Sequence, residues 1–103
     1  MDERPLPINV DTQRLAEFCR HWQIKELALF GSVLREDFRP DSDIDVLVSF
    51  KPGGGIDFDN RLEMQDELAE IFGRKVDLVE KEAVRNPFRR HNILTTREVV
   101  YAA

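Results

Sequence analysis

The sequence predicts an α/β (α+β) domain in which helices flank a small mixed β-sheet. Three observations support this prediction. Apolar residues recur at helical spacing in two segments, other short segments are rich in Val, Ile and Leu, and the two kinds of segment alternate along the chain. The chain has 103 residues, of which 42% are hydrophobic, enough for one two-layer core. We therefore expect a single domain over residues 1–103, with residues 1–10 leading into it.

The first expected helix begins at Asp11 or Thr12, because either residue can cap a helix. Its apolar stripe, at positions i, i+3, i+4 and i+7, consists of Leu15, Phe18, Cys19 and Trp22. Since Cys19 lies inside this stripe, we interpret it as a small buried hydrophobic residue rather than as a reactive thiol.

Two strands are expected next, at residues 27–30 and 44–50, and the polar stretch 33–42 between them predicts one helical turn followed by a loop. A second helix is expected to begin with Asp57 or Asp59 as its cap and to stop at Gly73. Its expected apolar stripe consists of Phe58, Leu62, Leu68, Ala69 and Phe72.

A third strand is predicted over residues 75–80. Because a helix connects it to the strand at 44–50, the two strands are expected to be parallel neighbours. A short helix is expected within residues 81–93, interrupted by Pro87, and residues 97–101 are either a strand or the end of a helix.

The charges divide the chain into an acidic body and a basic C-terminal segment. Residues 1–72 hold 8 basic and 16 acidic side chains, and residues 73–103 hold 7 basic and 4 acidic ones. The acidic body disfavours binding to duplex nucleic acid, which needs a basic stripe. The basic segment contains Arg85, Arg89 and Arg90, and it is either a solvated helix face or a docking surface for a partner.

Other classes of protein are also disfavoured. No apolar run approaches the roughly 18–20 residues that span a bilayer, and the N-terminus has no signal-peptide pattern. The single cysteine excludes an internal disulfide and a multi-cysteine zinc site. We expect no association with a membrane and a cytoplasmic location.

Asp43 and Asp45 stand at the start of an otherwise apolar strand. Residues two apart in a strand share one face, so both carboxylates project the same way, roughly 6–7 Å apart. A divalent cation such as Mg²⁺ would relieve their repulsion. The alternative is a turn in which both side chains are simply solvated.

Asp77 lies inside the strand expected beside residues 44–50. In a suitable register it would adjoin Asp43 and Asp45, and three carboxylates on one face could hold the two metal ions of phosphoryl-transfer chemistry. The alternative is a charge that protects an edge strand from aggregation.

Gly31-Ser32 follows the first strand, where backbone N–H groups at the start of a helical turn could bind phosphate. Gly31 permits a close approach of the backbone, and Ser32 adds a hydroxyl donor. Arg35 lies within reach of the same phosphate if the loop folds back, whereas Arg39 is interpreted as a solvated surface charge.

In combination, Gly31-Ser32, ten residues, Asp43-Ile44-Asp45 and the later Asp77 resemble the DNA polymerase beta-like nucleotidyltransferase superfamily. Within it, the chain is similar to the minimal nucleotidyltransferases, or MNT-domain proteins. The resemblance covers about residues 10–103. The sequence departs from the family pattern at Glu36, where members often carry glycine.

The resemblance implies a nucleotidyltransferase fold and roles for the motif residues. Asp43 and Asp45 would bind two Mg²⁺ ions, or Mn²⁺, and the triphosphate of ATP. Asp77 would bind the catalytic metal and help to activate the acceptor hydroxyl. The implied nucleotide-binding residues are Gly31, Ser32, Arg35 and Ser42.

The resemblance also implies a partner, because members of this family typically occur beside a HEPN-domain protein, often a ribonuclease toxin. The implied function is an antitoxin that transfers AMP from ATP to a tyrosine of that toxin, within a hetero-oligomer. Two further hypotheses stay open: a non-catalytic antitoxin or nucleotide-binding module that masks its partner, and an accessory subunit of a transferase for a small molecule or RNA.

Overall fold

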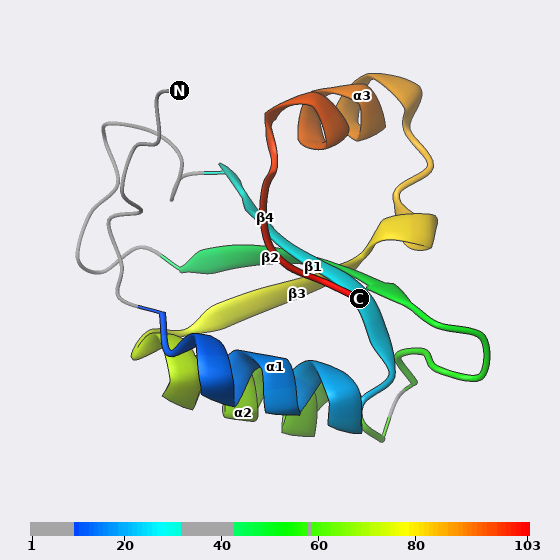
Figure 1. Cartoon of the computed structure of the whole chain (residues 1–103). Helices are drawn as coiled ribbons and strands as arrows, with labels where there is room; N and C mark the ends of the chain where they lie inside the picture. Colours follow the sequence, from blue (N-terminus) through cyan, green and yellow to red (C-terminus); the bar gives the residue numbers. More distant parts are fainter. Residues whose placement is uncertain (1–9, 32–42, 58) are drawn as a thin grey trace.

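The computed structural model describes residues 10–31, 43–57 and 59–103, which form helices on both faces of a mixed sheet (Figure 1). The elements in chain order are α1 (Thr12–His21), β1 (Ile24–Phe30), β2 (Ile44–Phe50), α2 (Arg61–Phe72), β3 (Val76–Glu80), the 3-10 helix η2 (Lys81–Ala83), α3 (Pro87–Thr96) and β4 (Glu98–Ala102). The predicted fold class is therefore confirmed. The expected turn and loop at 33–42 lie outside the described residues.

The sheet has the strand order β3-β2-β1-β4. The central strand β1 pairs antiparallel with both β2 and β4, whereas β2 and β3 are parallel. The parallel pairing predicted for residues 44–50 and 75–80 is thus confirmed. For residues 97–101 the sequence was compatible with a strand or with the end of a helix. The strand is confirmed, because β4 forms an edge of the sheet.

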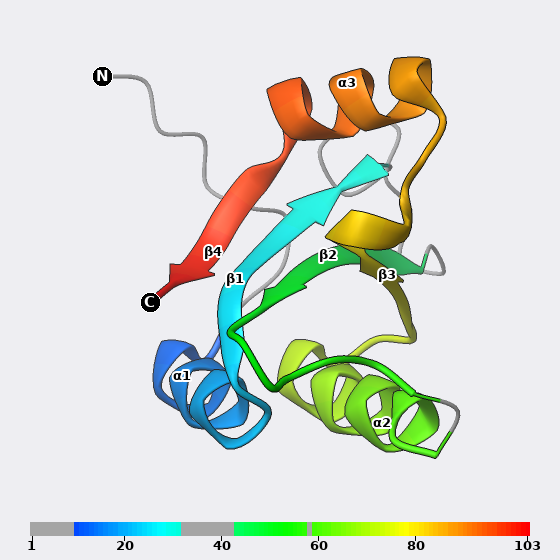
Figure 2. The same ribbon diagram turned by 90° about the vertical axis from the view of Figure 1, so that its right-hand side faces the viewer.

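Helices α1 and α2 cover one face of the sheet, and α3 lies over the other (Figure 2). The larger core lies under α1 and α2 and includes Leu15, Leu29, Val46, Leu68 and Leu78. The smaller core lies on the α3 face and consists of Ala28, Phe30, Leu47, Val84 and Ile93. Because side chains alternate along a strand, consecutive residues of β1 and β2 supply the two cores in turn.

Helix α1 has the predicted cap and apolar stripe. An Asp11 side-chain oxygen accepts a hydrogen bond from the backbone N–H of Arg14 at 3.1 Å, and Cys19 is fully buried. Burial raises the pKa of the Cys19 thiol to about 12, although the charge of Arg20 acts in the opposite direction. The interpretation of Cys19 as a buried hydrophobic residue is confirmed.

Helix α2 begins later than predicted, and its buried face agrees with the predicted one only in part. The cap position is Asn60, not Asp57 or Asp59. Asp57 instead shapes the preceding turn, where one of its side-chain oxygens accepts a hydrogen bond from the backbone N–H of Asn60 at 2.8 Å. Leu68 and Phe72 are buried as predicted, but Leu62 is 66% exposed and Met64 is buried instead. Phe58 lies outside the described residues. The stop at Gly73 is confirmed, with φ at +73°.

Pro87 begins α3 rather than interrupting a helix. At the first helical position, proline loses no intrahelical hydrogen bond, and its φ already suits the helix. The Asn86 side chain caps this start by accepting hydrogen bonds from the backbone N–H groups of Phe88 and Arg89, at 3.0 and 3.1 Å.

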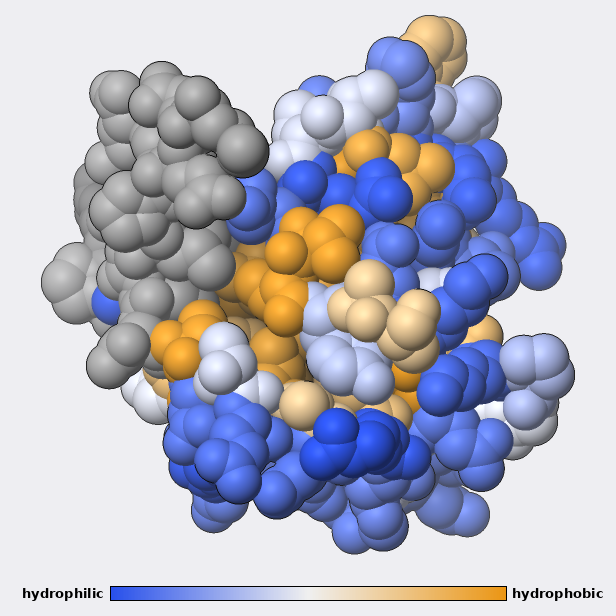
Figure 3. Space-filling view, viewed as in Figure 1, coloured by the Kyte–Doolittle hydropathy of each residue, from blue (hydrophilic) through white to orange (hydrophobic). Residues whose placement is uncertain are grey.

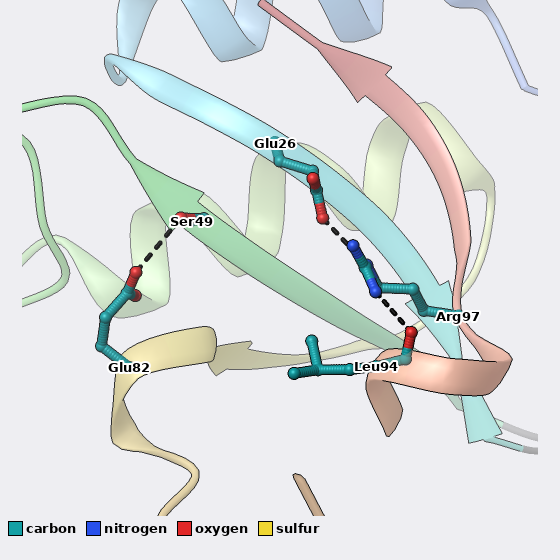
Figure 4. A network of polar contacts seen from close by, with 5 residues as sticks. All are labelled: Glu26, Ser49, Glu82, Leu94 and Arg97. Carbon is teal, nitrogen blue, oxygen red and sulfur yellow. Dashed lines mark hydrogen bonds and ion pairs between the residues drawn. The ribbon is translucent and has the colours of Figure 1, made fainter. Parts of the chain in front are cut away.

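Polar contacts join β1, β2 and the C-terminal elements on the α3 face (Figure 4). The Arg97 Nε donates to Glu26 at 3.0 Å, and the Arg97 Nη1 donates to the carbonyl of Leu94 at the end of α3. The Ser49 hydroxyl donates to Glu82 at 3.2 Å. These contacts tie η2, α3 and β4 to the central strands.

In the view of Figure 3, apolar surface gathers in the middle of the molecule, where β4 runs in Figure 1, and the surface over α1 below it is hydrophilic. Within the described ranges, no helix is both long enough and apolar enough to span a membrane.

Candidate functional site

The central feature of the candidate site is a pair of carboxylates on neighbouring parallel strands. Asp45 of β2 and Asp77 of β3 are direct partners in the sheet register. Partners in a sheet point to the same face and lie one strand spacing apart, about 4.8 Å. The expected juxtaposition of Asp77 with the D-x-D motif is therefore present at Asp45.

The pair lies at the starts of the two strands, on the face that α3 only partly covers. Val46 and Leu78, the next residues along each strand, point to the opposite face and are fully buried under α1 and α2. Asp45 is half-buried and Asp77 is exposed. The buried neighbours hold the two backbones in place, while Asp77 stays open to solvent.

Asp43 is exposed and lies two residues before Asp45, directly ahead of β2. Among the residues that the structure describes, no three His, Cys, Asp or Glu side chains are close enough to share one metal ion. Mg²⁺ is commonly bound by only one or two carboxylates together with the phosphates of a substrate. The hard oxygen donors of Asp45 and Asp77 fit that mode of binding, so the residues present suit magnesium with a nucleotide.

Gly31, directly after β1, packs against the Asp45 carboxylate. Its φ is +77°, and a Cβ placed on it would lie 2.3 Å from Oδ2 of Asp45. The Asp45 carboxylate therefore fills the space that a side chain at position 31 would occupy. The group that lies close to Gly31 is thus the Asp45 carboxylate, and the predicted approach of a phosphate to Gly31 stays a prediction.

Three of the predicted nucleotide-binding residues, Ser32, Arg35 and Ser42, lie outside the described residues, as does Glu36. Their predicted roles stay predictions. The described part of the site therefore consists of four residues. Gly31 follows β1, Asp43 precedes β2, Asp45 lies in β2 and Asp77 lies in β3.

Helix α2 contacts the strand that carries Asp77 through two side chains that the sequence analysis overlooked. Oε1 of Gln65 accepts a hydrogen bond from the backbone N–H of Leu78 at 3.1 Å. Nη2 of Arg61 donates to the carbonyl oxygen of the same residue. The signal in the sequence was a polar i, i+4 pair beside the apolar row of α2, which places both side chains on one helix face.

The comparison with protein families identifies the family to which this chain belongs. The model described as a nucleotidyltransferase domain matches residues 13–100. The chain belongs to the nucleotidyltransferase domain family.

Curated relatives of this nucleotidyltransferase carry related names. The protein adenylyltransferase MntA of Thermococcus cleftensis is 30% identical over 90 residues, which cover 87% of this chain and 86% of the relative. Protein MJ1379 of Methanocaldococcus jannaschii, named as a candidate protein adenylyltransferase, is 38% identical over 72 residues, which cover 70% and 72% of the two chains.

Several solved structures share the fold of this nucleotidyltransferase. A toxin-antitoxin structure with AMP-PNP has a TM-score of 0.70 at 21% identity, with 91% of this chain and 75% of the other covered. A structure of a tri-AMPylated Shewanella oneidensis HEPN toxin in complex with an MNT antitoxin has a TM-score of 0.62 at 20% identity, with coverage of 89% and 70%.

In this nucleotidyltransferase the basic C-terminal residues have different surroundings. Arg90 is used internally, because its Nη1 donates to the carbonyl oxygens of Lys81 at 2.8 Å and Val84 at 3.3 Å. Arg85 and Arg89 are exposed, and Phe88 between them is 86% exposed. The interpretation as a solvated helix face fails for Arg90, and a role in docking stays a prediction for the other two arginines.

Proposed function

We propose that this nucleotidyltransferase is an Mg²⁺-dependent protein adenylyltransferase that transfers AMP from ATP to a tyrosine hydroxyl of a HEPN-domain toxin, and that it acts as the antitoxin. The observation that carries the proposal is the register that sets Asp45 beside Asp77, with Gly31 packed against the Asp45 carboxylate. We further propose that residues 1–103 work as one minimal domain, in the cytoplasm.

The chemistry of nucleotidyl transfer explains why such a pair of carboxylates would be needed. A triphosphate brings negative charge to the site, and charge develops on the transferred phosphoryl group in the transition state. Asp45 and Asp77, together with the phosphates of ATP, would hold Mg²⁺, or Mn²⁺, and when bound the metal would neutralise that charge. The chain's own contribution is to fix the metal-binding oxygens on two rigid, adjacent strands.

The proposed reaction joins the acceptor oxygen to the α-phosphorus of ATP. The tyrosine oxygen forms the new P–O bond, the bond between the α-phosphorus and the bridging oxygen breaks, and pyrophosphate leaves. The phenolic proton goes to a base. The exposed carboxylate of Asp77 suits that role because it borders solvent, from which a partner's side chain would enter.

Support for a toxin as the acceptor comes from the relatives. One relative is named a protein adenylyltransferase, and a protein of the same fold stands in a complex with an AMPylated HEPN toxin.

The test is to incubate the chain with its neighbouring HEPN protein, ATP labelled on the α-phosphate, and Mg²⁺. We expect label on the toxin, a mass increase of one AMP per event, and no transfer when EDTA removes the metal. Replacement of the tyrosines of the toxin one at a time identifies the acceptor. Label in the EDTA sample contradicts metal dependence, and an unlabelled toxin in the complete mixture contradicts transfer to this partner.

A further inference from the structure

The outer edge of β3 is closed by a helix rather than by another strand. β3 is a five-residue edge strand, and among the described strands its only neighbour in the sheet is β2. Its core residue Leu78 has both backbone polar groups engaged by α2, through Gln65 on the N–H and Arg61 on the carbonyl. The two side chains therefore occupy the hydrogen-bonding positions that a further strand would use at this residue.

The alternation of the ladder explains why Leu78 needs these partners. The N–H of Ile44 donates to the carbonyl of Lys75 at 2.9 Å, so the peptide groups of Lys75 and, two residues on, Asp77 face β2. The groups of Leu78 face the other way. Without a partner they would depend on water, although the Leu78 side chain is fully buried.

We propose that Arg61 and Gln65 are positioning residues that hold β3 in the register and rotation that set Asp77 beside Asp45. The inference rests on the proposed function, because it concerns the Asp77 carboxylate as a metal ligand. It adds to that function a part for α2, which supplies none of the carboxylates of the site.

The physical reason is that an edge strand paired on one side can twist or shift. A shift by one residue would turn Asp77 toward the α1 and α2 core and Leu78 toward solvent. A smaller rotation would keep the pairing but move the Asp77 carboxylate relative to Asp45. Two hydrogen bonds to one residue, from two turns of the same helix, oppose both movements at the position next to Asp77.

The two side chains suit this task for different reasons. Gln65 is uncharged and accepts from an N–H group through its amide oxygen. Arg61 reaches the carbonyl from one helical turn earlier and is held at a fixed separation from Gln65 by the i, i+4 spacing. An apolar residue at either position would keep the helix but leave one backbone group of Leu78 without its present partner.

The experiment compares Gln65→Leu and Arg61→Met with the conservative variants Gln65→Glu and Arg61→Lys, which keep an acceptor and a donor respectively. Asp66→Leu is the matched control, because Asp66 lies on the same helix and is exposed. For each chain we would measure AMP transfer to the toxin at varied ATP and varied Mg²⁺, and hydrogen exchange of the Leu78 amide.

We expect Gln65→Leu and Arg61→Met to lower kcat and to raise the Mg²⁺ concentration for half-maximal rate by about 10-fold, as the loss of groups that orient metal ligands commonly does. The KM for ATP should change by less than about twofold, since no nucleotide contact is removed. Gln65→Leu should speed exchange of the Leu78 amide, and Gln65→Glu should restore slow exchange and most of kcat. Asp66→Leu should behave as wild type.

Two different failures can be told apart. If the wild-type chain transfers AMP but the Leu and Met variants keep its kcat and Mg²⁺ dependence, the positioning role is overturned and the proposed function stands. The positioning role is also overturned if these variants aggregate more but transfer AMP as wild type does. Arg61 and Gln65 would then only protect the edge of β3 from pairing with other chains. If the wild-type chain transfers no AMP, the proposed function is overturned and the positioning role falls with it.

Discussion

At the scale of single residues, the contact between Gly31 and Asp45 explains why glycine occupies position 31. The backbone there is left-handed, with φ at +77°, and the carboxylate of Asp45 fills the space of a side chain. Either feature alone would favour glycine. Together they mean that a change at Gly31 acts on stability through the backbone and on the site through Asp45.

We predict that Gly31→Ala and Gly73→Ala separate these two effects. Both glycines have positive φ, +77° and +73°, so each substitution should lower the free energy of unfolding by about 1–2 kcal/mol. A Cβ on Gly73 meets nothing within 4 Å, whereas one on Gly31 meets Asp45. Only Gly31→Ala should therefore lower the rate of AMP transfer, measured beside urea unfolding. Equal rates in the two variants would contradict the contact.

Cys19 leads to a prediction about pH. Burial raises the pKa of its thiol from 9.0 to about 12, so the thiol ionises more readily in the unfolded chain. The stability that depends on this difference is complete below pH 9 and is lost as the pH rises from 9 toward 12, by about 1.4 kcal/mol per pH unit. Urea unfolding of wild type and of Cys19→Ala at several pH values between 9 and 12 checks this prediction. For each pH unit, the free energy of unfolding should fall by about 1.4 kcal/mol more in wild type than in the variant. Parallel curves for the two chains would contradict it.

At the scale of elements, the ion pair of Arg97 with Glu26 joins the C-terminal segment to the central strand. Both side chains are 23% exposed, and the pair is 3.0 Å apart. Arg97 follows α3 directly and also donates to the carbonyl of Leu94, so one side chain connects β1, the end of α3 and the start of β4.

We predict that Arg97→Ala lowers the free energy of unfolding by about 1–3 kcal/mol, because it leaves a partly buried carboxylate without its partner. The control is Arg14→Ala, which removes the exposed pair between Arg14 and Glu70, 52% and 78% exposed and 4.0 Å apart. That change should cost less than about 0.5 kcal/mol. Chemical unfolding of both variants measures the two losses in free energy of unfolding. A larger loss in Arg14→Ala than in Arg97→Ala would contradict the prediction.

The elements also show what the sequence could predict. Spacing alone located α1, β2 and β3 and placed Asp77 near Asp45, because a helical crossover between two apolar strands leads to parallel neighbours. The buried row of α2 was misjudged at Leu62, since which of several apolar residues faces the sheet depends on how the helix docks. Gln65 and Arg61 were missed because a polar i, i+4 pair is common on helices, and their partner is a backbone edge that no residue type marks in the sequence.

At the scale of the whole molecule, the candidate carboxylates and the exposed C-terminal residues come from different elements. Asp45 and Asp77 lie at the starts of β2 and β3, whereas Phe88, Arg85 and Arg89 are exposed at and just before the start of α3. Substitutions of the carboxylates therefore leave these three residues unchanged, so binding of a partner and transfer to it can be tested with separate variants.

The last prediction uses Asp45→Asn and Asp77→Asn to distinguish catalysis from masking. Each change keeps the size of the side chain and removes a metal-binding charge, so AMP transfer to the toxin should be abolished. Folding should survive, because the loss of one of two adjacent like charges relieves repulsion in the metal-free chain. Binding to the toxin should also survive, since a stable interface spans roughly 800 Å² per partner and two atoms change little of it.

The measurements are the intact mass of the toxin, the affinity of the complex and rescue of growth from the toxin. An enzymatic antitoxin predicts variants that bind the toxin as wild type does, add no AMP and fail to rescue growth durably. A masking antitoxin predicts full rescue by the same variants without a mass shift, and that result would overturn the proposed transfer as the basis of protection. Loss of rescue together with retained binding would assign protection to the chemistry of Asp45 and Asp77.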